Sequence, residues 1–498
     1  MTNFDGLIIA PFRRPTFRSA ISSFYPIEEP WDSPPLLIAG AVEATGASVR
    51  YLPLQNIFLG FDEDRDQQLL REILNAHSAR LVIYASDNLI ASRSTAALYG
   101  IRLISKLLKG ELNAPIVGVV GRLATTAGES LFNLVPEVDF LVRGEAEIVI
   151  AKIAEEVLNN GLSALEGMEG VLTRPQISRG LKNIQVVKVK DLNSLPLPAY
   201  HLLEPAVNVL QSVRGRPRTK IPFSLRTSLG CKFQCKFCAG VPFWREYRMK
   251  SGDRVGAEID ALSNAIGDLA RLSFLEDEIF TLNENHVRSV AEVLRQRNLV
   301  LDGLYTHSSL MTSSIARALS LITNKVFLGL DNADDEILRT MGKGQSLDMV
   351  LSAVEVARQS SLKVHLEWII GSPKETVSTL ITSLGAIFNL IASGAVDSIN
   401  TYIYCPHPGT EYAENSKAYG IKILDNFEEI QESGGFPAYE TPHLTRNQIF
   451  SAYLMSQIVI AEAKTARDVL GTIKQVRGPN KSALQSLFDR ISSEDRKQ

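Results

Sequence analysis

Short apolar runs alternate with helical patterns twice along this chain, and this alternation is the feature that most restricts its fold. In the first 150 residues, helical patterns such as 36–45 and 66–76 separate five candidate strands: Gly6–Ala10, Ser48–Pro53, Arg80–Ala85, Pro115–Val120 and Asp139–Val142. Apolar strands that alternate with helices form a parallel sheet covered on both faces. The pattern predicts a doubly wound, Rossmann-like domain, whose ligands lie at the carboxyl ends of the strands.

The second alternation contains six candidate strands: Phe223–Ser228, Leu272–Leu275, Gly303–Thr306, Lys325–Leu330, Lys363–Ile370 and Ser398–Tyr404. Helical patterns separate these strands, as they do in an eightfold βα barrel. Six units are two short of a closed barrel, so we expect a partial (β/α)6 barrel of the TIM type. Chemistry in such barrels lies at the carboxyl ends of the strands.

The length of 498 residues is too great for one compact core, so the α/β chain is expected to divide into domains. We predict a doubly wound domain over residues 1–160 and a linker region over 161–215, which contains the proline-punctuated stretch 195–200. The partial barrel is predicted over 216–425, and a mostly helical extension over 426–498. Residues 434–443 of this extension are candidates for substrate contacts.

Three of the four cysteines form a CxxxCxxC run, Cys231, Cys235 and Cys238, directly after the first barrel strand. Cysteine thiolates hold iron–sulfur clusters, and three of them leave one iron of a cubane open for chemistry. A structural zinc site usually takes four ligands, so Cys405 or a histidine would have to complete it. A redox pair of Cys235 and Cys238 is the remaining alternative, and it leaves Cys231 unexplained.

The three cysteines, with Phe237 before the last of them, resemble the signature of the radical S-adenosylmethionine (radical SAM) superfamily. The resemblance implies a 4Fe-4S cluster on Cys231, Cys235 and Cys238, whose open iron chelates S-adenosylmethionine. It also implies reductive cleavage of S-adenosylmethionine to a 5′-deoxyadenosyl radical, with electrons from an external donor of the flavodoxin or ferredoxin type. The cofactor carries this chemistry, and the protein positions it in a dry pocket.

Further segments of the barrel resemble the superfamily in the same order: the lead-in Arg226–Gly230, Tyr247-Arg248 and Glu258 after the cysteines, and the loop Gly371–Thr376 after the fifth strand. The resemblance implies that cofactor-binding residues include Phe237, Glu276, Asp277, Asp331 and Gly371. Each acidic residue alone could equally be a helix cap or a surface charge. Their position at strand ends favours a functional role.

The first domain resembles that of the radical SAM subgroup with an N-terminal cobalamin-binding domain, through the landmarks Pro34-Pro35-Leu36, Tyr84-Ala85-Ser86, Gly121 and Val142–Glu147. Cobalamin would then lie against residues after the third and fourth strands: Ser86, Asp87, Asn88, Leu89, Gly121 and Arg122. The chain lacks the DxHxxG motif, because its first histidine is His77. Val120-Gly121 also stands where a Gly-Gly pair is common. The alternative is a domain that keeps the fold without the corrinoid.

These resemblances imply a cobalamin-dependent methyltransferase that acts on a poorly activated carbon of a small-molecule or natural-product substrate. One alternative is a radical SAM enzyme that catalyses a cyclisation or rearrangement, in which Cys405 could donate a hydrogen atom. Cys405 could equally be a small buried residue. A non-catalytic iron–sulfur or zinc protein is the alternative from a different class. The substrate itself has no signature in the sequence.

Composition excludes several other classes. The net charge of −3, without a dense basic run, gives no reason to expect a nucleic-acid partner. Four cysteines do not form a disulfide framework, and the N-terminus lacks a signal-peptide pattern, so we expect a cytoplasmic protein. Residues 377–395 carry no charge, but polar residues interrupt them. This segment is predicted to be a packed helix and not a membrane span.

Overall fold

The computed structural model describes residues 2–12, 33–57, 63–86, 91–110, 113–180, 185–214, 220–240, 245–267, 270–424 and 436–476. Its first unit is a six-stranded sheet with the strand order β2-β1-β3-β4-β5-β6. The strands are β1 (Thr2–Ala10), β2 (Val49–Pro53), β3 (His77–Ala85), β4 (Ile116–Val120), β5 (Phe140–Val142) and β6 (Val171–Thr173). The first five are mutually parallel, and β6 is antiparallel to β5.

Helices cover both faces of this sheet, because alternate strand residues point to opposite sides. Ile8 and Ile83 pack with helices α2 (Pro34–Glu43) and α8 (Ile150–Asn160), whereas Leu7 and Val82 pack on the other face. That other face is covered by α4 (Glu63–Ala76), α5 (Ala91–Lys109), α6 (Arg122–Ala127) and α7 (Leu131–Leu134). The predicted doubly wound domain is therefore confirmed. Folds with the order 2-1-3-4-5 bind ligands beyond the carboxyl ends of the strands, at the switch point between β1 and β3.

The predicted end of the first domain at residue 160 differs from the observed sheet, since β6 joins that sheet at 171–173. A three-residue antiparallel strand carries too short a pattern to be recognised in the sequence. The region predicted as a linker also contains α9 (Arg174–Ser178) and α10 (Leu203–Arg214). Tyr200 and Leu203 of this region share one apolar core with the N-terminal helices, Phe223 and Leu262. The two units are thus joined by packed side chains.

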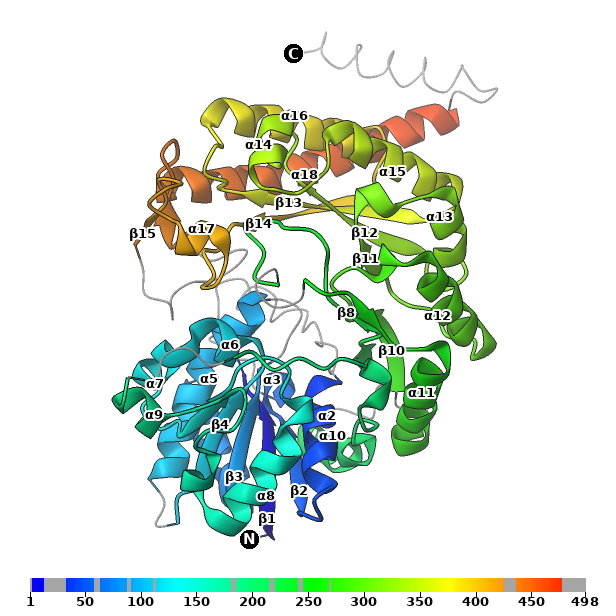
Figure 1. Ribbon diagram of the computed structural model, residues 1–498. Coiled ribbons are helices and arrows are strands. Elements are labelled where there is room, and N and C mark those ends of the chain that lie inside the picture. The colour runs from blue at the N-terminus through cyan, green and yellow to red at the C-terminus, as the bar shows by residue number, and fades with distance from the viewer. Residues whose placement is uncertain are drawn as a thin grey trace, which may run out of the picture.

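The second unit contains the six predicted barrel strands: β7 (Ile221–Leu225), β10 (Ala270–Leu275), β11 (Leu304–Thr306), β12 (Lys325–Asp331), β13 (Lys363–Ile370) and β14 (Ser398–Ile403). Strand β7 pairs with β10, and β11 to β14 form a second parallel group in chain order. The backbone of Asp302 donates to Ser273 at 2.8 Å between the two groups. Figure 1 shows this open barrel beside the N-terminal sheet, whose strands run from the N-terminus toward it.

The barrel helices are α11 (Gly252–Ile266), α12 (Glu284–Gln296), α13 (Ser313–Leu319), α14 (Asp335–Thr340), α15 (Leu347–Gln359) and α16 (Val377–Ala392). A polar side chain caps the amino end of each of these helices by accepting a backbone N–H, and the caps are Ser251, Asn283, Thr312, Asp334, Ser346 and Thr376. Two further helices, α3 (Leu54–Ile57) and α17 (Glu411–Glu414), are four residues long.

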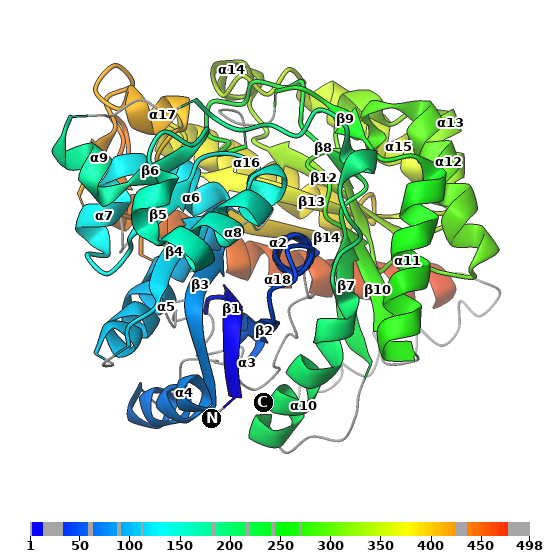
Figure 2. The same cartoon turned by 60° about the horizontal axis from the view of Figure 1, so that its bottom comes forward.

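The described part of the C-terminal extension is one long helix, α18 (Arg446–Val476), preceded by the short strand β16 (Tyr439–Glu440). Helix α18 packs along α16 and across β13 and β14, as Figures 1 and 2 both show. Strand β16 pairs with β15 (Lys422–Ile423). The uncharged segment near residue 377 is α16, which packs in the barrel layer. Among the described residues, no helix is both long and apolar enough to span a membrane.

Candidate functional site

The cysteine run lies in a loop that leaves the barrel at Gly230 and returns at Arg248. Its stem is an antiparallel pair, β8 (Ser228–Leu229) with β9 (Arg248–Met249). Gly230 has φ +107°, and a Cβ atom there would lie 2.1 Å from the carbonyl oxygen of Glu246. Glycine alone permits this close approach. The residue before the first cysteine is therefore fixed by the geometry of the stem.

All four cysteines are free thiols. Burial, together with a smaller contribution from the neighbouring Cys238, raises the pKa of Cys231 to about 11 and that of Cys235 to about 12. The three thiols of one loop thus lie within electrostatic reach of one another. Among the described residues, no three His, Cys, Asp or Glu side chains converge closely enough to hold a single metal ion. Each cysteine of a cubane cluster binds a different iron, so this donor set fits a three-cysteine cluster.

A lysine that sequence reasoning missed lies beside this loop. Lys343 Nζ is 2.6 Å from Asp331 Oδ2 at the end of β12, and it lies 5.9 Å from the ring centre of Phe237. Phe237 itself is half-buried against the barrel core. Asp331 has φ +55°, a conformation that costs free energy in a residue with a side chain. The predicted residues Phe237 and Asp331 are thus brought together, with Lys343 between them.

The carboxylate of Asp277 binds the segment that leads into the cysteine loop. It accepts the N–H groups of Thr227 at 2.7 Å and Ser228 at 2.5 Å, and the hydroxyl of Thr227 at 2.6 Å. Burial raises the pKa of Asp277 to about 6. These bonds tie the end of β10 to the segment that leads into the cysteines. Glu276 is buried beside Arg226, with 3.9 Å between the charged groups.

The loop after β13 is built around a second buried carboxylate. Glu375 accepts the backbone N–H of Gly371 at 2.6 Å and the side-chain amide of Asn332 at 2.8 Å. Burial raises the pKa of Glu375 to about 7. Gly371 has φ +96°, and Tyr439 donates to its carbonyl oxygen at 3.0 Å. Glu375 therefore joins the ends of β12 and β13, where two predicted cofactor residues, Asp331 and Gly371, lie.

On the N-terminal sheet, Ser86 is buried and its hydroxyl donates to the carbonyl oxygen of Val120 at 2.8 Å. Gly121 has φ +92° and directly precedes α6. Arg122 is buried and donates to Glu278 of the barrel at 2.7 Å. Residues 13–32 and 87–90, which follow β1 and β3, lie outside the described residues, and these include the predicted Asp87, Asn88 and Leu89.

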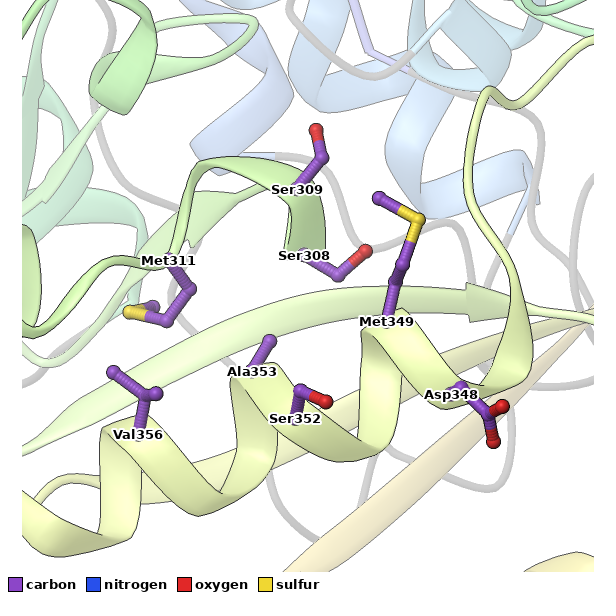
Figure 3. Close-up of a pocket in the computed structure, with 8 residues that line it drawn as sticks. All are labelled: Ser308, Ser309, Met311, Asp348, Met349, Ser352, Ala353 and Val356. Carbon is purple, nitrogen blue, oxygen red and sulfur yellow. The ribbon is translucent and has the colours of Figure 1, made fainter.

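Two features lie apart from the cysteine loop. Cys405 is buried with its sulfur 3.6 Å from Nδ1 of His407, and it packs against Ala438. A surface groove of about 280 Å³ runs between residues 308–311 and α15, with Met311 and Met349 along it (Figure 3). Beside the groove, His307 stacks on Phe233 of the cysteine loop, with 3.8 Å between the ring centres.

Sequence reasoning missed Lys343. It singled out Arg248 and the segments that contain Glu145, Glu278 and Glu375, but it did not predict the contacts by which these charged residues join distant segments. No spacing rule in the sequence predicts these contacts, because the partners of these residues lie in distant parts of the chain. Position at a strand end was the available signal for Glu278 and Glu375. The assigned roles of the predicted cofactor residues remain predictions.

Comparisons with known proteins agree with this architecture. A family model described as the radical SAM superfamily matches residues 225–385. The chain is 25% identical over 385 residues to a protein of Pyrococcus horikoshii named as an uncharacterized methyltransferase, covering 74% of this chain and 79% of the relative.

Two solved structures share the whole fold. The methyltransferase TsrM from Kitasatospora setae, with tryptophan and an S-adenosylmethionine analogue bound, has a TM-score of 0.61 at 16% identity, over 91% of this chain and 89% of its own. The cobalamin-dependent enzyme OxsB, with aqua-cobalamin and S-adenosylmethionine bound, has a TM-score of 0.59 at 14% identity, over 92% of this chain and 61% of its own. The cysteine loop, the barrel around it and the family match together identify a radical SAM domain over residues 225–385 of this chain.

Proposed function

We propose that this enzyme is a cobalamin-dependent methyltransferase that acts on a poorly activated carbon of a small-molecule substrate. The observation that carries the proposal is the contact between the two units: Arg122, at the end of β4, forms a buried ion pair with Glu278, which also binds the start of the cysteine loop. Ligands of a doubly wound sheet and of a βα barrel both lie at carboxyl strand ends. Here those two edges meet.

Cys231, Cys235 and Cys238 would hold the 4Fe-4S cluster, and S-adenosylmethionine would lie over the ends of β10 to β13. When bound, these cofactors supply the adenosyl radical, and cobalamin supplies the methyl group. The protein binds and orients them and excludes water. Lys343 keeps a positive charge at the cysteine loop, and Glu375 holds the loops after β12 and β13 in one arrangement.

An external electron donor of the flavodoxin or ferredoxin type would approach the cysteine loop from solvent. Lys232 and Gln234, between the first two cysteines, are exposed and offer that approach. The corrinoid would lie in the crevice of the N-terminal sheet, without a histidine ligand from a DxHxxG motif. This assignment is supported by the shared fold, because OxsB binds cobalamin and TsrM is a radical SAM methyltransferase.

The test starts from protein produced with added cobalamin, purified without oxygen and reconstituted with iron and sulfide. The visible spectrum and corrinoid content report whether cobalamin is retained. S-adenosylmethionine with a ¹³C-labelled methyl group is then incubated with reduced enzyme and a small-molecule extract. Label in a new metabolite, together with 5′-deoxyadenosine and S-adenosylhomocysteine, supports the proposal.

The matched control is Cys235→Ala, which removes one expected cluster ligand and should abolish both the label transfer and the formation of 5′-deoxyadenosine. Protein that retains no cobalamin under these conditions contradicts the proposal. Formation of 5′-deoxyadenosine without label transfer would point to a cyclisation or rearrangement. S-adenosylhomocysteine alone would indicate a polar methyl transfer without an adenosyl radical.

A further inference from the structure

Two buried ion pairs connect the N-terminal sheet to the stem of the cysteine loop. The first is Arg122 with Glu278, whose side chains are 4% and 8% exposed and whose closest N–O distance is 2.7 Å. The second carboxylate oxygen of Glu278 accepts the backbone N–H of Gly230 at 3.0 Å. One carboxylate therefore contacts both the end of β4 and the residue before Cys231.

The second ion pair is Glu145 with Arg248, at the other end of the same loop. Arg248 donates to both oxygens of Glu145, at 2.7 and 2.6 Å, and the two side chains are 6% and 8% exposed. Glu145 also accepts the backbone N–H of Val189 at 2.5 Å, and Arg248 donates to the carbonyl oxygen of that residue. A bidentate pair of this kind fixes orientation as well as distance.

The two pairs stand at the two ends of one loop. The loop leaves the barrel at Gly230 and returns at Arg248, which is the strand partner of Leu229. Their N-terminal partners, Arg122 and Glu145, follow β4 and β5 at the carboxyl edge of the sheet. The side chain of Thr125 joins these two strand ends, since it donates to Gly121 at 2.7 Å and accepts from Gly144 at 2.9 Å.

A buried ion pair often adds little stability over an apolar pair of the same size, because both charges lose their hydration. A gain in stability therefore does not explain well why two such ion pairs occur at one interface. Fixed geometry is a better account, since functional groups must be held to within a fraction of an ångström. The apolar core that the two units share holds them together, but apolar contacts are not directional and do not orient the loop.

We infer that Glu278 and Glu145 are positioning residues that hold the two ends of the cysteine loop against the ligand edge of the N-terminal sheet. They thereby set the separation between the cluster site and the group carried by that sheet. The inference rests on the proposed function in taking this group to be cobalamin. The contacts themselves do not depend on the corrinoid.

The test compares Glu278→Gln and Glu145→Gln with Asp302→Asn in full-length, cluster-reconstituted protein. Asp302 pairs with Arg271 at 2.5 Å on the same barrel, but both side chains are about 40% exposed, so this variant is the matched control. Hydrogen exchange without corrinoid is measured over residues 226–249. We expect each interface variant to speed exchange at its own end of the loop by roughly tenfold, and the control to leave it unchanged.

The second readout is methyl transfer from S-adenosylmethionine to reduced cobalamin, relative to 5′-deoxyadenosine formation, in the same preparations. Misplacement by about 1 Å should lower this ratio by roughly tenfold or more while iron content and the electron paramagnetic resonance spectrum of the cluster stay unchanged. The double variant Arg122→Glu with Glu278→Arg restores opposite charges but leaves the Gly230 N–H without its acceptor, so it should not recover the ratio. Arg248→Lys, which keeps the charge but loses the bidentate geometry, is the milder variant if Glu145→Gln fails to fold.

An unchanged ratio in both interface variants overturns the inference, even if exchange increases, because the pairs would then be structural only. Unchanged exchange overturns it as well. If the wild-type protein takes up no cobalamin, the proposed function is contradicted. The inferred separation between the cluster site and the cobalamin is then contradicted as well. The exchange experiment still shows in that case whether the two pairs hold the loop, so the two failures are distinguishable.

Discussion

Lys343 and Asp331 form an ion pair at the end of β12, with 2.6 Å between Nζ and Oδ2, beside the cysteine loop. Burial opposes the charge on Lys343, but Asp331, Cys235 and Cys238 outweigh it and raise the pKa of the lysine. Lys343 is therefore a fixed positive charge near the expected cluster. A nearby charge is one of the features that set the reduction potential of an iron–sulfur centre.

Lys343→Met should make the cluster harder to reduce. Two unit charges about 8 Å apart interact by about 2 kcal/mol at an effective dielectric constant near 20. For a one-electron couple, 59 mV corresponds to 1.4 kcal/mol, so we expect the midpoint potential to fall by roughly 50–100 mV. Anaerobic redox titration monitored by electron paramagnetic resonance measures this shift.

The double variant Lys343→Met with Asp331→Asn is the control, because it removes the anion together with the cation. Its potential should lie closer to that of the wild type. A midpoint potential unchanged in Lys343→Met would show that the lysine charge is too well screened to influence the cluster.

Replacing the loop cysteines one at a time should remove the cluster, whereas replacing Cys405 should not. Cys231→Ala, Cys235→Ala and Cys238→Ala each delete one expected iron ligand. Cys405 is buried, as Cys235 is, but it contacts His407 and Ala438 and lies outside the loop. Iron and sulfide content after reconstitution checks the prediction. Full iron content in any loop variant would contradict the assigned ligand set.

Much of the architecture could be predicted because it depends on local patterns. Apolar runs and helix caps are signals that lie within a few consecutive residues. All eleven predicted strands are present, with small shifts at their ends. The cysteine spacing is likewise local. The strands that escaped prediction, such as β6 and the pair β8 and β9, are two or three residues long and too short for periodicity to show.

The contacts that organise the site could not be predicted, because they join residues far apart in the chain. Glu278 is 156 residues from Arg122, and Arg248 is 103 residues from Glu145. No spacing rule relates such pairs until the fold brings them together. The strand-end position of Asp277 predicts a cofactor contact, which stays a prediction. The hydrogen bonds of its carboxylate to the backbone of residues 227 and 228 had no signal in the sequence.

Glu375 should make folding stability depend on pH. Burial raises the pKa of this side chain from 4.5 to about 7, so between these values the folded protein keeps a proton that the unfolded chain has lost. The contribution of this group to the free energy of unfolding is thus fully present below pH 4.5. It is lost as the pH rises through about 7, by about 1.4 kcal/mol per pH unit between these two values. Denaturant unfolding at several pH values measures the slope.

Glu375→Gln should remove this contribution, since an amide does not titrate in the range. The informative quantity is the difference in unfolding free energy between wild type and variant, because other groups cancel in it. That difference should change by about 3 kcal/mol between pH 4.5 and 7. A difference that is constant with pH would show that Glu375 titrates at its usual value.

Gly371→Ala should lower both stability and S-adenosylmethionine binding. Gly371 has φ +96°, and an added Cβ would lie 1.9 Å from the hydroxyl oxygen of Tyr439. The variant therefore suffers backbone strain of about 1–2 kcal/mol and a steric clash. Gly161→Ala is the matched control, because Gly161 has φ +79° with no atom within 4 Å of the added carbon. It should show the backbone strain alone.

The clash and the strain can be separated by removing the hydroxyl. In Gly371→Ala with Tyr439→Phe, the nearest remaining contact of the added carbon is the ring carbon at 3.1 Å, so most of the steric cost should disappear while the strain remains. Unfolding free energies and calorimetric binding of S-adenosylmethionine provide the measurements. If Gly371→Ala costs no more than Gly161→Ala, then Tyr439 does not hold this loop, and the C-terminal extension has no part in shaping the cofactor site.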